Sequence, residues 1–147
     1  MASNAFNNAL QKILAAYLVS GADIRIALVM TNTTCDIDKD AINFVANITT
    51  LDECDASGYA RIALGSEASN VDDVNDRAEF DGTDISFTGL GTGTRAYLGI
   101  LVFKFVTDDT DSVPLFFIDF PTDVANTSSQ VDVTFNVEGI AQLSQAV

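Results

Sequence analysis

Apolar side chains near the start of the chain recur at spacings of three and four residues, which is the period of an α-helix. The pattern predicts a helix from about residue 4 to residue 19, with Ser3 or Asn4 as its N-cap and Gly21 as the residue that ends it. Its apolar face consists of Phe6, Leu10, Ile13, Leu14 and Tyr17. Burial of this face within the same domain is the default interpretation, and binding of a partner is the sharper hypothesis.

The pattern then changes to a period of two, which indicates a β-strand. Apolar residues at positions 24, 26, 28 and 30 alternate with Asp23, Arg25, Ala27 and Val29, and a polar turn over residues 31–40 follows. Residues 40–52 return to helical spacing and predict one further short helix, although threonines at 49 and 50 disfavour it. The apolar positions of this second helix are Ala41, Phe44, Val45, Ile48 and Leu51.

Most of the remaining chain has the composition and spacing of strands. Strands are predicted over residues 59–64 and around Phe80, Ile85 and Phe87, with a turn at Asp81-Gly82 and an acidic loop over residues 65–76. Residues 97–106 and 115–120 have apolar side chains on both faces and are expected to pair as a hairpin of doubly covered strands. Residues 131–138 alternate strictly, which predicts a strand with one face in the core.

These elements predict a mainly β fold. The fold class is an antiparallel β-sandwich, jelly-roll-like, with an amphipathic N-terminal helix and one further short helix. The length of 147 residues and the lack of a linker indicate a single β-rich domain over residues 1–147, with the helix in residues 1–20 and the sandwich body in residues 21–147.

The charge of the chain narrows the choice of partners. Seven basic and 21 acidic residues give a net charge of −14, and the chain has no histidine. Binding to nucleic acid or to an anionic membrane surface depends on Lys and Arg, so we expect neither partner. Residues 1–8 carry no positive charge before an apolar run, so no secretory signal is expected, and synthesis in a cytoplasm is the expectation.

The residue inventory also argues against catalysis. Without histidine, neither a Ser-His-Asp triad nor a Cys-His pair can form, and the commonest zinc ligand is absent. Paired carboxylates of a glycoside hydrolase are possible by number, but the Asp residues cluster in predicted turns, where they usually bond their own backbone. We therefore expect no enzyme activity, no catalytic residues and no cofactor.

Three short motifs partly match known cation-binding or nucleotide-binding patterns. Asp36, Asp38 and Asp40 begin like a calcium loop, but the pattern lacks the glycine and the final glutamate of such loops, so a solvated turn is preferred. Asp108, Asp109 and Asp111 are interpreted as a hairpin tip, although they could hold a cation. Residues 91–96 (GTGTRA) match a relaxed dinucleotide fingerprint, but they precede a strand where that fingerprint needs a helix. No metal site is predicted.

The two cysteines, Cys35 and Cys54, are expected to be free thiols, because a reducing cytoplasm disfavours disulfides. A bridge between them remains an alternative under oxidising conditions.

Taken in order, six segments resemble a family of small structural proteins of tailed bacteriophages, of the capsid cement or head decoration type, notably in phages of cyanobacteria. They are residues 23–28 (DIRIAL), 58–61 (GYAR), 78–87 (AEFDGTDISF), 95–97 (RAY), 115–120 (LFFIDF) and 135–140 (FNVEGI). The resemblance implies a sandwich-like fold that self-associates as a homotrimer, binds the major capsid protein and lies on the exterior of the virion. It implies no catalytic residues.

A cement protein needs an apolar surface for its contacts. The N-terminal helix face is one candidate, and the aromatic hairpin of Phe103, Phe105, Phe116 and Phe117 is the other. Two further functions stay open: another virion component, such as a head fibre base, neck or tail protein, and a carbohydrate- or receptor-binding module that uses the acidic loops.

Overall fold

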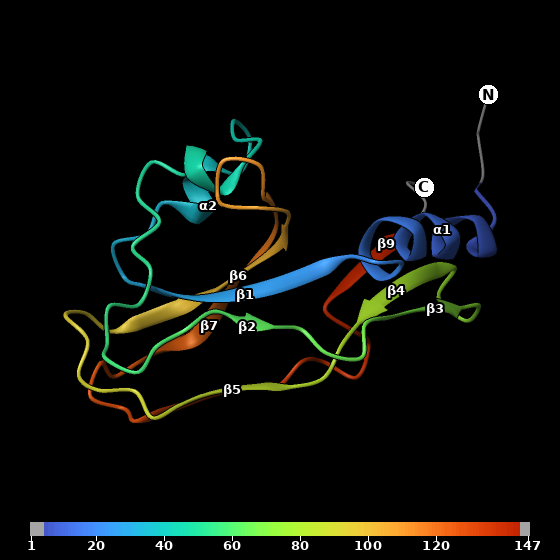
Figure 1. The fold of residues 1–147 in the computed structure, drawn as a ribbon. Coiled ribbons are helices and arrows are strands. Elements are labelled where there is room, and N and C mark those ends of the chain that lie inside the picture. Colours follow the sequence, from blue (N-terminus) through green and yellow to red (C-terminus); the bar gives the residue numbers. More distant parts are fainter. Residues whose placement is uncertain (1–4, 145–147) are drawn as a thin grey trace. The chain divides into compact units, whose positions relative to one another are not determined.

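A computed structural model describes residues 5–144, and within them it confirms a mainly β, antiparallel, sandwich-like fold with an N-terminal helix (Figure 1). These residues contain nine strands in three antiparallel sheets. They group into two compact units. Unit 1 consists of the described residues within 1–22, 64–84 and 134–147, and unit 2 consists of residues 23–63 and 85–133.

The helix of unit 1 is α1 (Asn7–Leu14), which continues as a π-helical turn over Ala15–Val19. The predicted helix over residues 4–19 is thus confirmed from Asn7 onward, with Phe6 as the N-cap residue, and the caps proposed at Ser3 and Asn4 lie outside the described residues. The backbone N–H of Ser20 donates to the carbonyl of Ala15 at 2.8 Å, which closes the wider turn. Gly21 then adopts a φ of +68° and ends the helix, as predicted.

The sheet of unit 1 has the order β3-β4-β9, with β3 (Ala68–Asp72), β4 (Arg77–Asp81) and β9 (Ala141–Ser144). The prediction of an acidic loop over residues 65–76 is wrong, because β3 lies inside it and forms a hairpin with β4. Strand β9 was not predicted. Both strands are short, and both contain small or polar residues that hide the period of two.

The two faces of this sheet differ in chemistry. Ala78 and Phe80 of β4 are fully buried, on the face where Leu143 of β9 pairs with Ala78, and α1 packs against β3, β4 and β9. On the opposite face, the guanidinium of Arg77 forms ion pairs with three carboxylates. These belong to Asp72, Glu79 and Glu138. Unit 1 is therefore a helix on an apolar sheet face, with an ionic cluster behind the sheet.

The main sheet of unit 2 has the order β2-β1-β6-β7, in which every neighbouring pair is antiparallel. Its strands are β1 (Asp23–Met30), β2 (Ile62–Ala63), β6 (Tyr97–Phe105) and β7 (Val113–Val124). The predicted strand after the helix and the predicted hairpin are confirmed as β1 and as β6–β7. Strand β6 is buried on both faces as expected, whereas β7 is only partly buried, and the strand predicted over residues 59–64 is limited to β2.

One face of this sheet is covered by the segment that includes α2 (Cys35–Asp38) and a 3-10 turn over Val45–Asn47 (Figure 1). The helix predicted over residues 40–52 is wrong, and the short helix α2 lies before it. The reason is that the backbone N–H groups of Val45 and Ala46 donate to the carbonyls of Ser112 and Asp109 in the β6–β7 turn, so they are not available to a helix. Val45 and Ile48 are still buried, as core residues of an irregular segment.

The second sheet of unit 2 pairs β5 (Ile85–Thr88) with β8 (Gln130–Val133). Figure 1 shows β5 on the side of β1 and β6 that faces away from α2. The strand predicted over residues 131–138 is confirmed only to Val133, and Val137 is 94% exposed. Beyond Val133 the chain belongs to unit 1, where the N–H of Phe135 donates to Asp84. The Asp81-Gly82 turn does not join a hairpin, because β4 and β5 pair with different strands.

Strand β7 forms one edge of the four-stranded sheet. It contains both prolines of the chain, Pro114 and Pro121. Its register with β6 shifts twice, between Tyr97 and Gly99 and between Val102 and Phe103. The regular part of this edge is thus reduced to a few residues around Phe117.

Candidate functional site

The structure divides the predicted interface residues of the N-terminal helix between two faces. Leu10 is 6% exposed and Leu14 is partly buried, so these two point toward the sheet of unit 1. Phe6, Ile13 and Tyr17 are 83%, 59% and 45% exposed. The single predicted stripe is therefore divided into buried and exposed side chains.

The inner face fixes α1 on its sheet. Leu18, which the prediction left out, is buried together with Leu10. The side-chain amide of Gln11 donates to the carbonyl and to the hydroxyl of Ser69 on β3, at 3.0 and 2.9 Å. At the start of the helix, the amide of Asn7 donates to Asp73 at 3.0 Å. These contacts hold the helix in one orientation, so its outer face is presented in a fixed way.

The outer face of the N-terminal helix, including its π-helical turn and caps, consists of Phe6, Ala9, Ile13, Ala16, Tyr17 and Ser20, with the charged side chain of Lys12 exposed beside them. Ala9 and Ile13 lie one turn apart on α1, whereas Ala16 and Tyr17 belong to the π-helical turn, whose period is wider than that of an α-helix. In the sequence, the larger side chains at positions 10 and 14 concealed this face. Exposed side chains of this size and number on one helix are typical of an interaction surface.

The acidic loops, which were candidate cation sites, use their carboxylates to hold their own backbone. Asp38 accepts hydrogen bonds from the hydroxyl of Thr34 at 2.6 Å and from the N–H of Thr49 at 2.7 Å, and these bonds lower the pKa of its carboxyl group. Asp111 accepts from the N–H groups of Thr107 and Asp108, which lowers its pKa in the same way. Between residues 5 and 144, no three Cys, Asp or Glu side chains gather in a metal-binding group.

Arg61 organises a partly buried polar cluster in unit 2. Its guanidinium binds both carboxylate oxygens of Glu53, at 2.7 and 2.8 Å, and it also binds Asp109. The hydroxyl of Tyr59 donates to Glu53 at 2.6 Å, and burial raises the pKa of that phenol. The hydrogen bond from Arg61 holds the pKa of Asp109 below its usual range. Every charged group of the cluster is thus paired within unit 2.

The glycine-rich segment before β6 is a loop that packs closely against neighbouring backbone segments. The N–H of Gly91 donates to the carbonyl of Ser57 at 2.8 Å, and the N–H of Gly93 donates to the carbonyl of Asn126 at 2.9 Å. A Cβ atom at Gly91 would lie 2.3 Å from the hydroxyl of Ser57. The segment leads into β6 as predicted, so its resemblance to a dinucleotide fingerprint lacks the helix that would bind phosphate.

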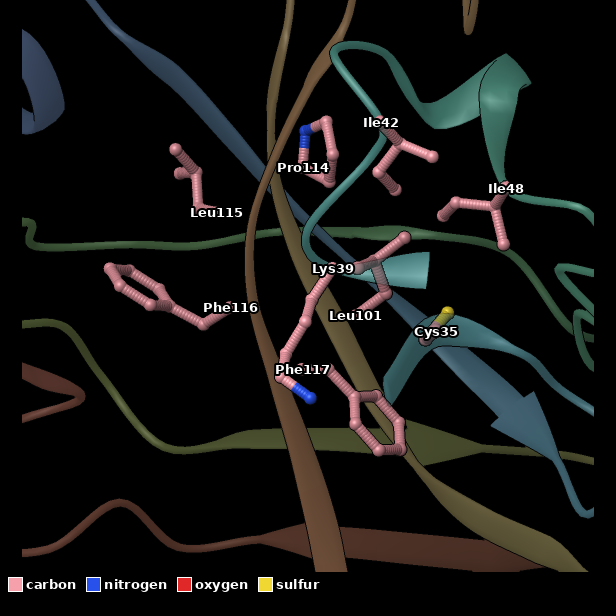
Figure 2. A pocket seen from close by; sticks show the side chains of 9 residues that line it. All are labelled: Cys35, Lys39, Ile42, Ile48, Leu101, Pro114, Leu115, Phe116 and Phe117. Atoms are coloured by element: carbon pink, nitrogen blue, oxygen red, sulfur yellow. The ribbon is translucent and has the colours of Figure 1, made fainter. Parts of the chain in front are cut away.

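A small pocket lies beside β6 and β7 in unit 2 (Figure 2). Its volume is about 100 Å³, and Cys35, Ile42, Ile48, Leu101 and Phe117 are among its lining residues. The Lys39 amine at its rim donates to the carbonyl of Asp36 at 2.9 Å. The pocket borders the predicted aromatic hairpin: Phe116 and Phe117 are partly buried, and Phe103 is fully buried.

Both cysteines are free and buried, as expected. Burial raises the pKa of each thiol. A thiol with a raised pKa is a poor nucleophile at neutral pH, so neither cysteine has the environment of a reactive residue.

Among residues 5–144, no helix is long and apolar enough to cross a membrane. No family model matches the chain, no curated protein matches it, and no solved structure matches it.

Proposed function

We propose that this chain is a non-catalytic structural protein of a tailed bacteriophage particle, a cement or decoration protein on the outside of the capsid shell. The observation that carries the proposal is a contrast between its polar and apolar groups. The buried polar side-chain atoms of the described residues all have hydrogen-bond partners within the fold, whereas large apolar side chains lie exposed on the N-terminal helix.

The pairing of the buried polar groups supports a non-catalytic role. No buried side-chain nitrogen or oxygen of the described residues lacks a hydrogen-bond partner. Arg61, Arg77 and Arg95 each pair with carboxylates of their own unit. Active sites usually contain polar groups that are held ready for a substrate and stay unsatisfied without it. The arrangement favours a protein that acts through its surface.

The exposed apolar side chains of the N-terminal helix support an adhesive role. Exposed apolar side chains on a rigidly held helix can contact a neighbouring subunit, and the same modest contact repeated over many copies gives a strong overall effect. The net charge of −14 keeps the remaining surface hydrated and repels nucleic acid. Both properties suit a protein on the exterior of a particle that is filled with DNA.

The carbohydrate-binding alternative is less well supported. A glycan site that depends on a cation would need free carboxylates in the loops, and Asp38, Asp108 and Asp111 already accept hydrogen bonds from neighbouring residues. Glycan binding that is lost on chelation would contradict this assignment.

The test is the number of copies of this chain in purified particles, measured by quantitative mass spectrometry against the major capsid protein. A cement protein is expected in hundreds of copies, because it follows the repeats of the shell. A dozen copies or fewer would point to a neck, tail or fibre component, and absence from the particle would overturn the proposal entirely. Turnover of a substrate by the purified chain would also contradict it.

A further inference from the structure

We propose that residues 34–50 form a strap that opens from the main sheet of unit 2 in acid while the sheet itself stays folded, and that the opening exposes the thiol of Cys35. The strap contains α2, the 3-10 turn and the irregular backbone between them. It lies entirely within unit 2. The inference concerns the chain alone and does not depend on the proposed function.

The first argument is that the strap is joined to the sheet by side-chain packing and not by strand pairing. Residues 34–50, all of which the structure describes, include no β-strand. Cys35, Val45 and Ile48 of the strap are buried in the core cluster that also contains Leu101 and Phe103 of β6. Segments with little regular backbone hydrogen bonding open at a lower free energy than the strands beneath them. The strap is therefore the part of unit 2 that should open first.

The second argument is that one carboxylate oxygen joins the two ends of the strap. The Oδ2 atom of Asp38 accepts hydrogen bonds from the hydroxyl of Thr34 at 2.6 Å and from the N–H of Thr49 at 2.7 Å. The N–H of Thr50 donates to the same hydroxyl of Thr34 at 2.9 Å. A charged carboxylate is a stronger acceptor than a neutral carboxyl group, so protonation of Asp38 weakens the closure of the strap.

The middle of the strap also depends on a carboxylate. The N–H groups of Val45 and Ala46 donate to the carbonyls of Ser112 and Asp109 in the β6–β7 turn, at 2.9 and 2.8 Å. The side chain of Asp109 is in turn bound by the guanidinium of Arg61. Protonation of Asp109 weakens this ion pair, which fixes the turn to which the strap is bonded.

These contacts set the direction of the pH dependence. The hydrogen bonds from Thr34 and Thr49 lower the pKa of Asp38, and the hydrogen bond from Arg61 lowers the pKa of Asp109. A carboxyl group with a lowered folded-state pKa stabilises the closed state above its unfolded pKa of about 4, and this contribution is lost as the pH falls through the folded-state pKa. The strap should therefore be closed above pH ~5 and should open below pH ~4.

The neighbouring titratable groups leave this direction unchanged. Thiol, phenol, ammonium and guanidinium groups keep their protons between pH ~3 and pH ~6, so only carboxyl groups titrate in this range. Within the β6–β7 turn, Asp111 accepts from the N–H groups of Thr107 and Asp108, and its lowered pKa acts in the same direction. The other groups near the two carboxyls are Cys35, Asp36, Lys39 and Asp40 on the strap, and Glu53 and Tyr59 beside Arg61.

The two cysteines report separately on the strap and on the sheet. Both are buried. Cys35 lies in α2 and lines the pocket beside β6 and β7 (Figure 2). Cys54 lies outside the strap, and its N–H donates to the carbonyl of Leu28 on β1 at 2.9 Å. An open strap would thus expose Cys35 and leave Cys54 buried.

The first experiment measures how fast 4,4′-dithiodipyridine, a disulfide reagent that works in acid, labels each cysteine, with mass spectrometry to assign the site. The ratio of the Cys35 rate to the Cys54 rate should rise about tenfold or more between pH ~5 and pH ~3. The same ratio in the urea-unfolded chain corrects for the intrinsic reactivity of the two thiols. An equal rise at both cysteines would mean that unit 2 unfolds as a whole, and an unchanged ratio would mean that the strap stays closed. Either result would overturn the proposal.

The second experiment removes the charge of the strap at neutral pH. Asp38→Asn keeps the size of the side chain, and it should raise the labelling rate of Cys35 about tenfold at pH ~7, leave the rate of Cys54 unchanged and weaken the dependence on pH. The matched control is Asp36→Asn, at a 76% exposed carboxylate on the same helix, and it should change neither rate. No effect of Asp38→Asn, or an equal effect of both variants, would contradict the role of Asp38. Circular dichroism verifies that each variant keeps its strands.

Discussion

In unit 2, the four-stranded sheet is enclosed by its own chain: the segment around α2 covers one face, and the β5–β8 pair lies on the other side of β1 and β6. In unit 1, the three-stranded sheet has α1 on one face and the ionic cluster of Arg77 on the other, and α1 carries exposed apolar side chains outward. Unit 2 thus uses its large apolar residues mainly for internal packing. Unit 1 leaves Phe6, Ile13 and Tyr17 of its helix exposed. Internal packing and exposed apolar side chains thus predominate in different parts of the chain.

The largest expected effect is on the free energy of unfolding, compared between a buried phenylalanine of unit 2 and an exposed phenylalanine of unit 1. Phe103 is fully buried in unit 2, and Phe103→Ala should lower the free energy of unfolding by about 3–5 kcal/mol, because it leaves a cavity. Phe6→Ala, at an 83% exposed position, should change it by less than about 0.5 kcal/mol. Urea denaturation measures both values. Similar losses in the two variants would mean that Phe6 also belongs to a core.

The next effect concerns the polar cluster that supports unit 2. Arg61→Met leaves Glu53 and Asp109 partly buried without their cation, so we expect a loss of about 1–3 kcal/mol in the free energy of unfolding. The control Lys39→Met removes an ion pair with Asp36 that is well exposed on both sides, and it should cost less than about 0.5 kcal/mol. An equal cost for both variants would contradict a structural role for the cluster.

The same cluster predicts how acid affects stability. The pKa of Asp109 is held below its unfolded value by Arg61, so this contribution is complete above pH ~4 and is lost as the pH falls through the folded-state pKa. The difference in unfolding free energy between the unchanged chain and Arg61→Met should therefore be largest above pH ~5 and should narrow below pH ~4. Denaturation series at several pH values measure it. A constant gap down to pH ~2 would show that Asp109 does not contribute through its charge.

The smallest expected effect is the reactivity of the two buried cysteines with a thiol reagent. Cys35 and Cys54 are buried, and burial raises the pKa of both thiols, so neither should react with a thiol reagent at pH ~8 unless the chain is unfolded in urea. Absorbance of the released thiolate measures the two reactions. Rapid labelling of Cys35 alone would show that the pocket beside β6 and β7 opens in the native protein.

The sequence predicted most of the elements in which the apolar residues follow a regular spacing because they pack against the core. Strand β1 and the β6–β7 hairpin followed directly from alternation and from long apolar runs. The prediction was wrong where backbone partners decide the conformation: Val45 and Ala46 have helical spacing, but their N–H groups bond to the β6–β7 turn. It was also wrong where alternation continues after a strand ends, since Val137 fits the pattern of β8 and yet lies in solvent.

For the candidate surface, the sequence predicted the helix but not which of its apolar side chains are exposed. Leu10 and Ile13 look equivalent in a helical pattern, and only the position of the sheet makes one buried and the other exposed. The exposed alanines at positions 9 and 16 were missed, because a small side chain gives a weak hydrophobic signal even where it allows close helix packing.

The prolines and register shifts of β7 disfavour one way in which copies of the chain could associate. A proline has no N–H to offer an incoming strand, and a bulge disturbs the straight ladder that such a strand would need. Pro114 and Pro121 bracket the regular stretch of this border strand. Copies held close together would thus resist stacking into a continuous fibrous sheet, and they would remain separate molecules that touch through side chains.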